Sequence, residues 1–223
     1  MRIAEISVHS CPLRPLGTGD VGGMNLYILS LCDETNKLGI EVDIFARRHD
    51  QNEPEIIQVN EKTRLIHIRA GQAGDISTLD DYNYLPEFQA NLLSFIKRED
   101  AKYDILRSHY WTSALLAEKI KKQLGLRDVV TFHTLGAVKN RAFGTRLEPG
   151  LRIKSEKEIV ANADCIVTST DEGKNNLINL YSASPEKVNV IPPGVNLDFF
   201  HPGDKEKARR DLDLEDYRRV LLF

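Results

Sequence analysis

The chain has 223 residues and a net charge of −3, with 41% hydrophobic and 28% charged residues. That composition is typical of a soluble globular protein with room for one large or two small domains. Basic residues are interspersed with acidic ones, which excludes a basic nucleic-acid-binding surface, and no apolar run is long enough for a transmembrane segment. The three cysteines lack metal-site spacing, so we expect a reduced, cytoplasmic protein.

Along the chain, the spacing at which hydrophobic residues recur alternates between that of strands and that of helices. The first strand–helix–strand segment comprises a strand over 2–8, a helix over 24–38 that Gly39 ends, and a strand over 41–46. Two short strands, a loop over 71–84 and a helix that Pro86 starts come next. Further alternations place strands at 103–106, 128–132, 165–169 and 188–191, and helices at 114–124, 152–163 and 171–181. The pattern predicts a doubly wound, mostly parallel, Rossmann-like α/β sheet.

The character of the chain changes beyond Gly194. Residues 196–203 are linker-like, 204–214 are charged and helical in pattern, and 219–223 open like a buried strand. We therefore expect a main domain over 1–195. Residues 196–223 would be the linker and first strand of a second, truncated domain.

Three histidines, His9, His109 and His133, each fall at the end of a predicted strand. Because ligands of doubly wound sheets bind outside the carboxyl ends of the strands, these histidines would face one crevice. The alternative for each is a separate, locally hydrogen-bonded histidine. A zinc site of three histidines and water is a further alternative, although no H-x-x-H or H-E-x-x-H spacing occurs.

A glycine-rich loop precedes the first helix, where backbone N–H groups suit an anionic or polyhydroxyl ligand. Gly17, Gly19 and Gly22 match the dinucleotide fingerprint G-x-G-x-x-G. That fingerprint needs a tight turn directly after the strand, but here the lead-in is long and contains two prolines. Arg47 and Arg48 stand where an acidic residue would bind a ribose, so only NADP would fit this alternative.

Several segments together resemble the family 4 retaining glycosyltransferases. They are His9, Gly17 to Tyr27, Ser108 to Trp111, Thr131 to Thr134, Ala163-Asp164, Ser169 to Glu172, and Val190 to Asn196. Within the family, the chain most resembles the branch that transfers N-acetylglucosamine to inositol phosphate in mycothiol synthesis, and more distantly the sucrose-phosphate synthases. The resemblance covers nearly the whole chain.

The resemblance implies a GT-B enzyme, in which two Rossmann-like domains face each other across a cleft. This chain is similar to the N-terminal, acceptor-binding half, and the Glu-x7-Glu element of the nucleotide-sugar half is absent. The implied donor, a UDP-sugar or another nucleotide-sugar, would be approached by Gly22, Gly23 and His133. The implied acceptor-binding residues are His9, Asp20, Gly23, Met24, Asn25, Tyr110, His133, Thr134 and Arg152.

The implied function is retaining transfer of a sugar to a small hydroxylated acceptor, with this fragment inactive alone. Positioning can supply most of the catalysis, so we name no catalytic residue or resident cofactor on this chain. A requirement for Mg²⁺ and a homodimer stay open. The alternative functions are a non-catalytic, Rossmann-like ligand-binding or regulatory domain and, within the same class of enzyme, a sucrose-phosphate-synthase-like activity.

One departure concerns the acceptor. Relatives place a lysine from the loop before the third helix on the acceptor phosphate, whereas residues 71–86 contain no Lys or Arg. Asp75, Asp80 and Asp81 stand there and would repel a dianion. A neutral sugar or polyol is therefore an alternative to a phosphorylated acceptor.

Overall fold

The computed structural model describes residues 1–15, 17, 22–144, 147–214, 217 and 219–221. Asp20, a predicted acceptor ligand, lies outside the described residues. The chain divides into two compact units, residues 1–192 and 193–223. The interpretation of residues 196–223 as the start of a nucleotide-sugar domain stays a prediction.

Within the described residues, the first unit contains one eight-stranded sheet of order β3-β4-β2-β1-β5-β6-β7-β8. Every neighbouring pair is parallel except β3 and β4, which form an antiparallel edge hairpin. The predicted doubly wound, Rossmann-like sheet is thus confirmed. The strands are β1 (Arg2–Ser7), β2 (Glu41–Arg47), β3 (Ile56–Gln58), β4 (Thr63–Ile68), β5 (Ile105–His109), β6 (Arg127–Thr131), β7 (Cys165–Thr168) and β8 (Val188–Val190).

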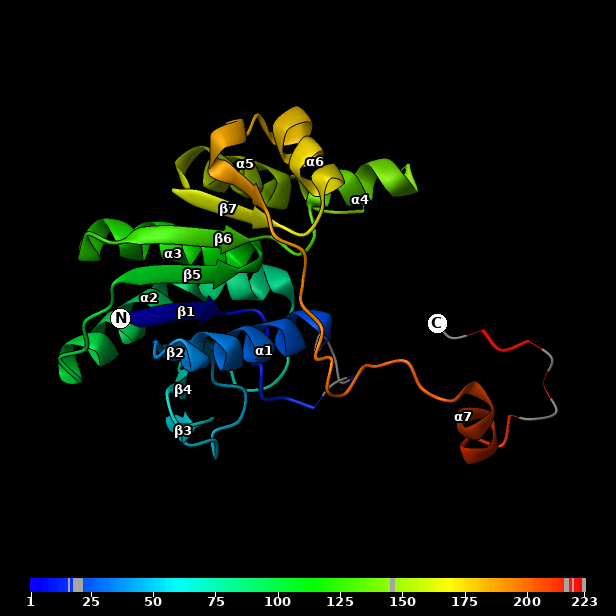
Figure 1. Cartoon of the computed structure of the whole chain (residues 1–223). Helices are drawn as coiled ribbons and strands as arrows, with labels where there is room; N and C mark the ends of the chain where they lie inside the picture. Colours follow the sequence, from blue (N-terminus) through cyan, green and yellow to red (C-terminus); the bar gives the residue numbers. More distant parts are fainter. Residues whose placement is uncertain (16, 18–21, 145–146, 215–216, 218, 222–223) are drawn as a thin grey trace. The chain divides into compact units, whose positions relative to one another are not determined.

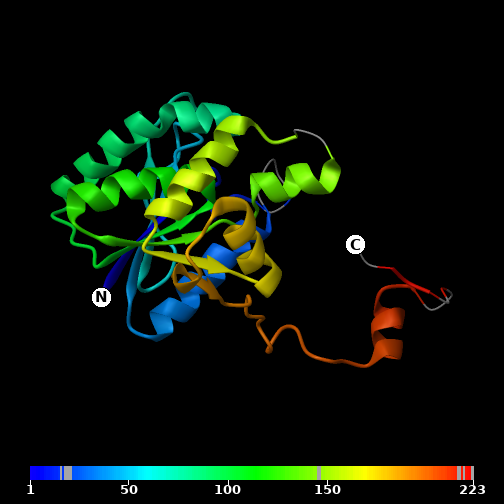
Figure 2. The same ribbon diagram turned by 90° about the horizontal axis from the view of Figure 1, so that it is seen from above.

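Helices cover both faces of this sheet, as Figures 1 and 2 show. Adjacent strand residues point to opposite faces, so Phe45 and Ile66 pack in the core under α2, α3 and α5, while Ile44 and Leu65 pack under α1. The helices are α1 (Gly23–Lys37), α2 (Thr78–Arg98), α3 (Tyr110–Leu124), α4 (Gly136–Phe143), α5 (Gly150–Asn162) and α6 (Asp171–Tyr181), with a 3₁₀ turn at Pro185–Lys187. Among the described residues, no helix is long and apolar enough to cross a membrane.

The helix predicted to begin at Pro86 begins earlier, at Thr78, and contains Pro86 in its interior. Ser77 caps it by accepting a hydrogen bond from the Asp80 amide at 3.2 Å, and the acidic first turn complements the positive end of the helix dipole. The sequence analysis read these residues as part of a long loop, and that interpretation is wrong. It also missed α4 altogether.

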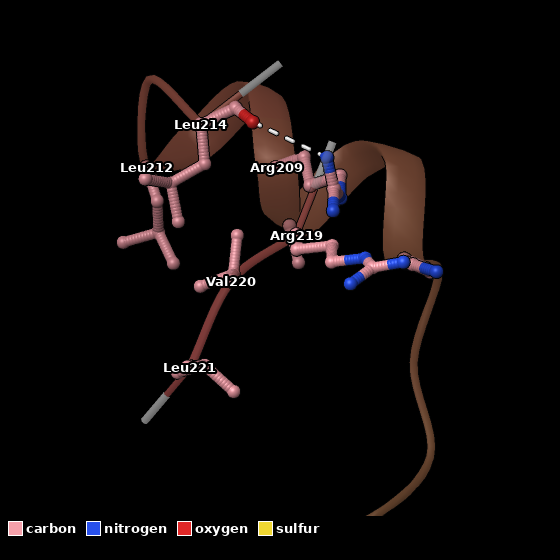
Figure 3. Close-up of a pocket in the computed structure, with 8 residues that line it drawn as sticks. Arg209, Leu212, Leu214, Arg219, Val220 and Leu221 are labelled. Atoms are coloured by element: carbon pink, nitrogen blue, oxygen red, sulfur yellow. Dashed lines mark hydrogen bonds between the residues drawn. The ribbon is translucent and has the colours of Figure 1, made fainter. Parts of the chain in front are cut away.

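The second unit contains α7 (Lys205–Asp211), which Asp204 caps through the amides of Glu206 and Lys207. Beside α7 lies a hollow of about 530 Å³, shown in Figure 3, and Arg209 donates a hydrogen bond to the Leu214 carbonyl at its rim. Its apolar lining is largely exposed, with Leu221 89% accessible. The strand predicted over 219–223 is not formed over residues 219–221, and Leu222 and Phe223 lie outside the described residues.

Candidate functional site

The order of the strands defines a crevice in the first unit. The chain adds β2 on one side of β1 and later β5 on the other side, so the strand order reverses between β1 and β5. In such sheets ligands bind at the carboxyl ends of the strands beside this reversal. His9 follows β1, His109 ends β5, and His133 follows β6.

Two of these histidines contact each other directly. Nδ1 of His109 lies 2.9 Å from Nε2 of His133. The other nitrogen of His109 bonds to the carboxylate of Glu5, which also accepts a hydrogen bond from Arg107. Among the described residues, no group of three or more His, Cys, Asp or Glu side chains is arranged to hold a metal ion. The imidazoles instead form a hydrogen-bonded chain that runs from the sheet core to the crevice.

Burial would raise the pKa of Glu5, but the charge of Arg107 and the hydrogen bonds from Arg107 and His109 outweigh it and hold that pKa below its usual value. At the other end of this row of hydrogen bonds, desolvation of the ring lowers the pKa of His133 to about 3. His133 is therefore neutral at physiological pH. A neutral imidazole offers one donor and one acceptor nitrogen.

The backbone at the strand ends is in the left-handed region at two non-glycine residues. Tyr110 has a φ of 73° and His133 a φ of 59°. A hydrogen bond of 2.7 Å from the Thr134 amide to the Phe132 carbonyl closes a tight turn around His133. Such conformations cost on the order of 1–3 kcal/mol and cluster at functional sites. Here the left-handed backbone aims the side chains of Tyr110 and His133 across the crevice. The ring of Tyr27 lies edge-on to that of His133, with 5.3 Å between the ring centroids.

Arg152 on α5 is 2% exposed and organises the far side of the crevice. Its Nη2 donates to the carbonyl and hydroxyl oxygens of Thr134 at 3.0 and 2.9 Å. Its Nε donates to Glu156 at 2.8 Å, and its Nη1 lies 2.9 Å from Glu148. The guanidinium also lies over the ring of Tyr110, 4.9 Å from its centroid. The Arg152–Glu156 pair, four residues apart on α5, is buried and is not a surface salt bridge.

The carboxylate of Glu156 lies at the N-terminus of α4 and accepts a hydrogen bond from its first amide. It accepts from the Gly136 amide at 3.0 Å and from the Tyr181 hydroxyl at 2.5 Å, and that hydroxyl accepts from the Ala137 amide at 2.8 Å. A Cβ on Gly136 would lie 3.3 Å from the Arg152 side chain and from Glu156. The first amides of α4 are thus satisfied by the chain itself.

The N-terminus of α1 is different. Gly22 is its N-cap and Gly23 its first residue, the first turn carries no acidic residue, and among the described residues nothing lies within 4 Å of a Cβ built at either glycine. The side-chain oxygen of Asn25 accepts a hydrogen bond from the Gly22 amide at 3.3 Å. Buried Asn25 fixes the start of the helix: its Nδ2 lies 2.8 Å from both the Ser10 hydroxyl and the Cys11 carbonyl. Asn25 therefore ties the β1–α1 loop to the helix. Its predicted contact with an acceptor hydroxyl stays a prediction, as do the contacts of Gly22, Gly23 and Met24.

His9 links the crevice to the loop before α2. Its ring stacks on Tyr110 at 5.0 Å, and its Nδ1 lies 2.8 Å from Asp81. Arg47 donates to the Gln72 and Gly74 carbonyls, and Arg48 donates to carbonyls of its own loop. Both arginines hold loop backbone, which disfavours the NADP interpretation.

The acidic residues of this loop also have partners. Asp75 pairs with Arg14 at 2.5 Å, Asp81 with His9, and Asp80 accepts from the Ser77 hydroxyl at 2.7 Å. The repulsion of a dianion inferred from the sequence is therefore weaker than three unpaired carboxylates would produce. A cavity of about 40 Å³ lies beside this loop, lined by His9, Ser10, Arg14, Arg47, His49, Asp75 and Ile76.

The structure thus brings together five predicted site residues, His9, Tyr110, His133, Thr134 and Arg152. The sequence analysis missed Glu5, Arg107, Glu156 and Tyr181 as parts of the site. One signal was available: Glu5 is an acid between the apolar residues Ala4 and Ile6 of the central strand, and fully buried carboxylates are rare unless paired. Trp111 is 3% exposed and stacks on Tyr82, so it packs inside the fold.

Comparison with known proteins gives this site a family context. The D-inositol 3-phosphate glycosyltransferases of Thermobispora bispora and Corynebacterium glutamicum are 40% and 38% identical to the chain. Each alignment covers 100% of this chain but 53% and 54% of the relative, so the chain spans about half the length of these curated relatives.

Solved structures agree on the fold. Sucrose-phosphate synthase from Thermosynechococcus elongatus has a TM-score of 0.85 at 29% identity, over 96% of this chain and 52% of that one. Anabaena Alr3699/HepE in complex with UDP and glucose has a TM-score of 0.63 at 11% identity, over 97% of this chain and 51% of that one. The sheet is therefore a Rossmann-like half of a GT-B fold.

The sequence profile of Glycosyltransferase Family 4 matches residues 21–199, which include α1, the residues at the ends of β5 and β6, and Arg152. The chain belongs to glycosyltransferase family 4.

Proposed function

We propose that this chain supplies the acceptor-binding half of a retaining glycosyltransferase that moves a sugar from a UDP-sugar to a small hydroxylated acceptor. One observation carries the proposal: His9, Tyr110, His133, Thr134 and Arg152 converge at the carboxyl ends of β1, β5 and β6. Family membership favours this enzyme over a non-catalytic regulatory domain.

The donor diphosphate would lie at the N-terminus of α1. Gly22 and Gly23 let a ligand approach the backbone closely, and the positive end of the helix dipole favours an anion. The start of α4, by contrast, is already occupied by Glu156. The HepE structure with UDP and glucose supports a UDP-sugar as donor.

The acceptor would lie against His9, Tyr110 and Thr134. The Thr134 hydroxyl accepts from Arg152, so its own proton remains available to donate to an acceptor oxygen. The nearby charges are matched within the chain, since Arg152 and Lys139 together pair with Glu148 and Glu156. A phosphorylated acceptor would take the place of Glu148 beside Nη1 of Arg152, whereas a neutral polyol needs no such exchange.

Catalysis in this proposal is positional. Holding the acceptor hydroxyl beside the anomeric carbon, with preorganised donors around the departing diphosphate, lowers the barrier without a general base on this chain. Asn25 contributes by fixing the loop that carries His9 and Ser10 to the start of α1.

Turnover by the full-length protein tests the proposal. UDP release would be measured from UDP-glucose and UDP-N-acetylglucosamine, each with D-inositol 3-phosphate or with unphosphorylated inositol as acceptor. Asn25→Ala is expected to lower kcat/KM by about 10- to 100-fold, because the loop loses its fixed position. Asn36→Ala is the matched control, since Asn36 bonds to Asn60 and Thr63 near the other end of the same helix. A full-length protein that neither binds UDP nor turns over a UDP-sugar would refute the proposed function.

A further inference from the structure

Glu5 is a fully buried carboxylate in the central strand of the sheet, and none of the proposed ligand contacts uses it. Its partners are Arg107 and His109, both on the neighbouring strand β5. A buried acid in a position that an apolar side chain could fill carries a desolvation cost. Its contacts with Arg107 and His109 indicate what Glu5 does for the crevice.

The hydrogen bonds have a defined direction. A carboxylate only accepts, so Nε2 of His109 must carry a proton and donate it to Glu5. If His109 is neutral, its Nδ1 is then a lone pair and accepts from Nε2–H of His133. That assignment leaves Nδ1 of His133 without a proton. Within the described residues, no hydrogen bond engages this nitrogen, and His133 is exposed at the crevice.

The charges around these hydrogen-bonded side chains favour a neutral His109. Glu5 and Arg107 already balance each other, and a cationic His109, which is 0% exposed, would add an uncompensated buried charge. The other titratable groups nearby add no charge at physiological pH, because desolvation raises the pKa of both Tyr27 and Cys32 and lowers that of His133. The cluster is therefore electrically neutral only with both imidazoles uncharged.

We propose that Glu5 is a positioning residue that acts through His109: it fixes the proton of His133 on Nε2, so that Nδ1 faces the crevice as a hydrogen-bond acceptor for a hydroxyl of the transferred sugar. The sugar contact rests on the proposed function. The proton assignment stands on the structure alone.

Glu5→Gln is expected to reverse the direction of the hydrogen bonds that run from residue 5 through His109 to His133. The side chain of residue 5 nearly keeps its shape. The amide oxygen of glutamine must accept from Arg107, so its NH₂ group faces His109. Nε2 of His109 then accepts, its Nδ1–H donates to Nε2 of His133, and the proton of His133 moves to Nδ1. The crevice would present a donor where the wild type presents an acceptor.

Nitrogen-15 NMR of the histidine side chains in the full-length protein tests this, since protonated and lone-pair nitrogens differ strongly in chemical shift. The His133 signals would be assigned by their loss in His133→Gln. The wild type should show Nε2 protonated and Nδ1 unprotonated, Glu5→Gln should show the reverse, and kcat with a UDP-sugar should fall about tenfold, the equivalent of one hydrogen bond. Asp43→Asn is the matched control, a buried carboxylate on β2 that holds Arg2, Arg64 and Tyr103 and should leave His133 unchanged.

A wild-type His133 with its proton on Nδ1 would overturn the inference without any variant. An unchanged tautomer in folded Glu5→Gln would overturn it equally. If the wild type lacks UDP-sugar turnover, the proposed function fails, but the tautomer measurement still decides the role of Glu5.

Discussion

Replacing Arg152 with methionine is expected to destabilise the fold by about 3–5 kcal/mol, the usual effect of removing one partner from a buried ion pair. Arg152 is 2% exposed and lies against two carboxylates, Glu148 at 2.9 Å and Glu156 at 2.8 Å. Methionine fills much of the same volume but leaves the fully buried Glu156 without its cation. Urea denaturation of the wild type and the variant measures the difference.

Two further variants separate the charge from the packing. Lys139→Met removes a cation 2.9 Å from the same Glu148, but Lys139 is 40% exposed, so its loss should cost less than about 1 kcal/mol. Glu156→Gln in the Arg152→Met background should recover part of the stability, because the buried charge is then gone. Equal losses for Arg152→Met and Lys139→Met would contradict the central place given to Arg152.

The protein is expected to lose stability as the pH falls below neutrality, with His49 as a main contributor. His49 is 8% exposed, and burial, together with repulsion from Arg47 and Arg14, lowers its pKa to about 4 from an ordinary value of 6.5. Between these values the unfolded chain binds the proton and the folded chain does not. The stability from this group is therefore complete above about pH 6.5 and is lost as the pH falls toward about 4.

Each pH unit in that window costs about 1.4 kcal/mol, so His49 should remove about 2 kcal/mol between about pH 7.5 and 5. His133 has the same sign of shift and adds a smaller loss, because it lies exposed at the crevice. Urea denaturation at several pH values measures the slope. His49→Gln should flatten it, whereas His201→Gln, which changes an exposed histidine, should not. A slope that is unchanged in His49→Gln would contradict this assignment.

The fold could be predicted from sequence because short apolar runs, which become the central strands, alternate with segments whose hydrophobic residues recur at helical spacing. Errors arose where a local signal opposed the tertiary structure. Pro86 predicts a helix start, yet Ser77 and the acidic residues after it provide the cap that begins α2 eight positions earlier. Short α4 has little periodicity, and Glu156 and Tyr181 stabilise its start from distant parts of the chain.

The site was predictable in location but less so in its contacts. Strand ends placed His9, His109 and His133 at one edge, because parallel strands share a direction. Their partners come from other elements: Glu5 on β1 pairs with His109 and Arg107 of β5, and Asp81 on α2 pairs with His9. Sequence spacing cannot reveal such pairs, since their residues lie 72 to 104 positions apart.

The central claim is that ligands bind at the carboxyl ends of β1, β5 and β6. Amide hydrogen exchange of the full-length protein, with and without UDP and a hydroxylated acceptor, tests this most directly. We expect protection in peptides that cover residues 9–15, 22–27, 109–112 and 133–138, and none in the 99–104 segment before β5. Protection confined to 99–104, or no protection at the strand ends while UDP is bound, would contradict the account.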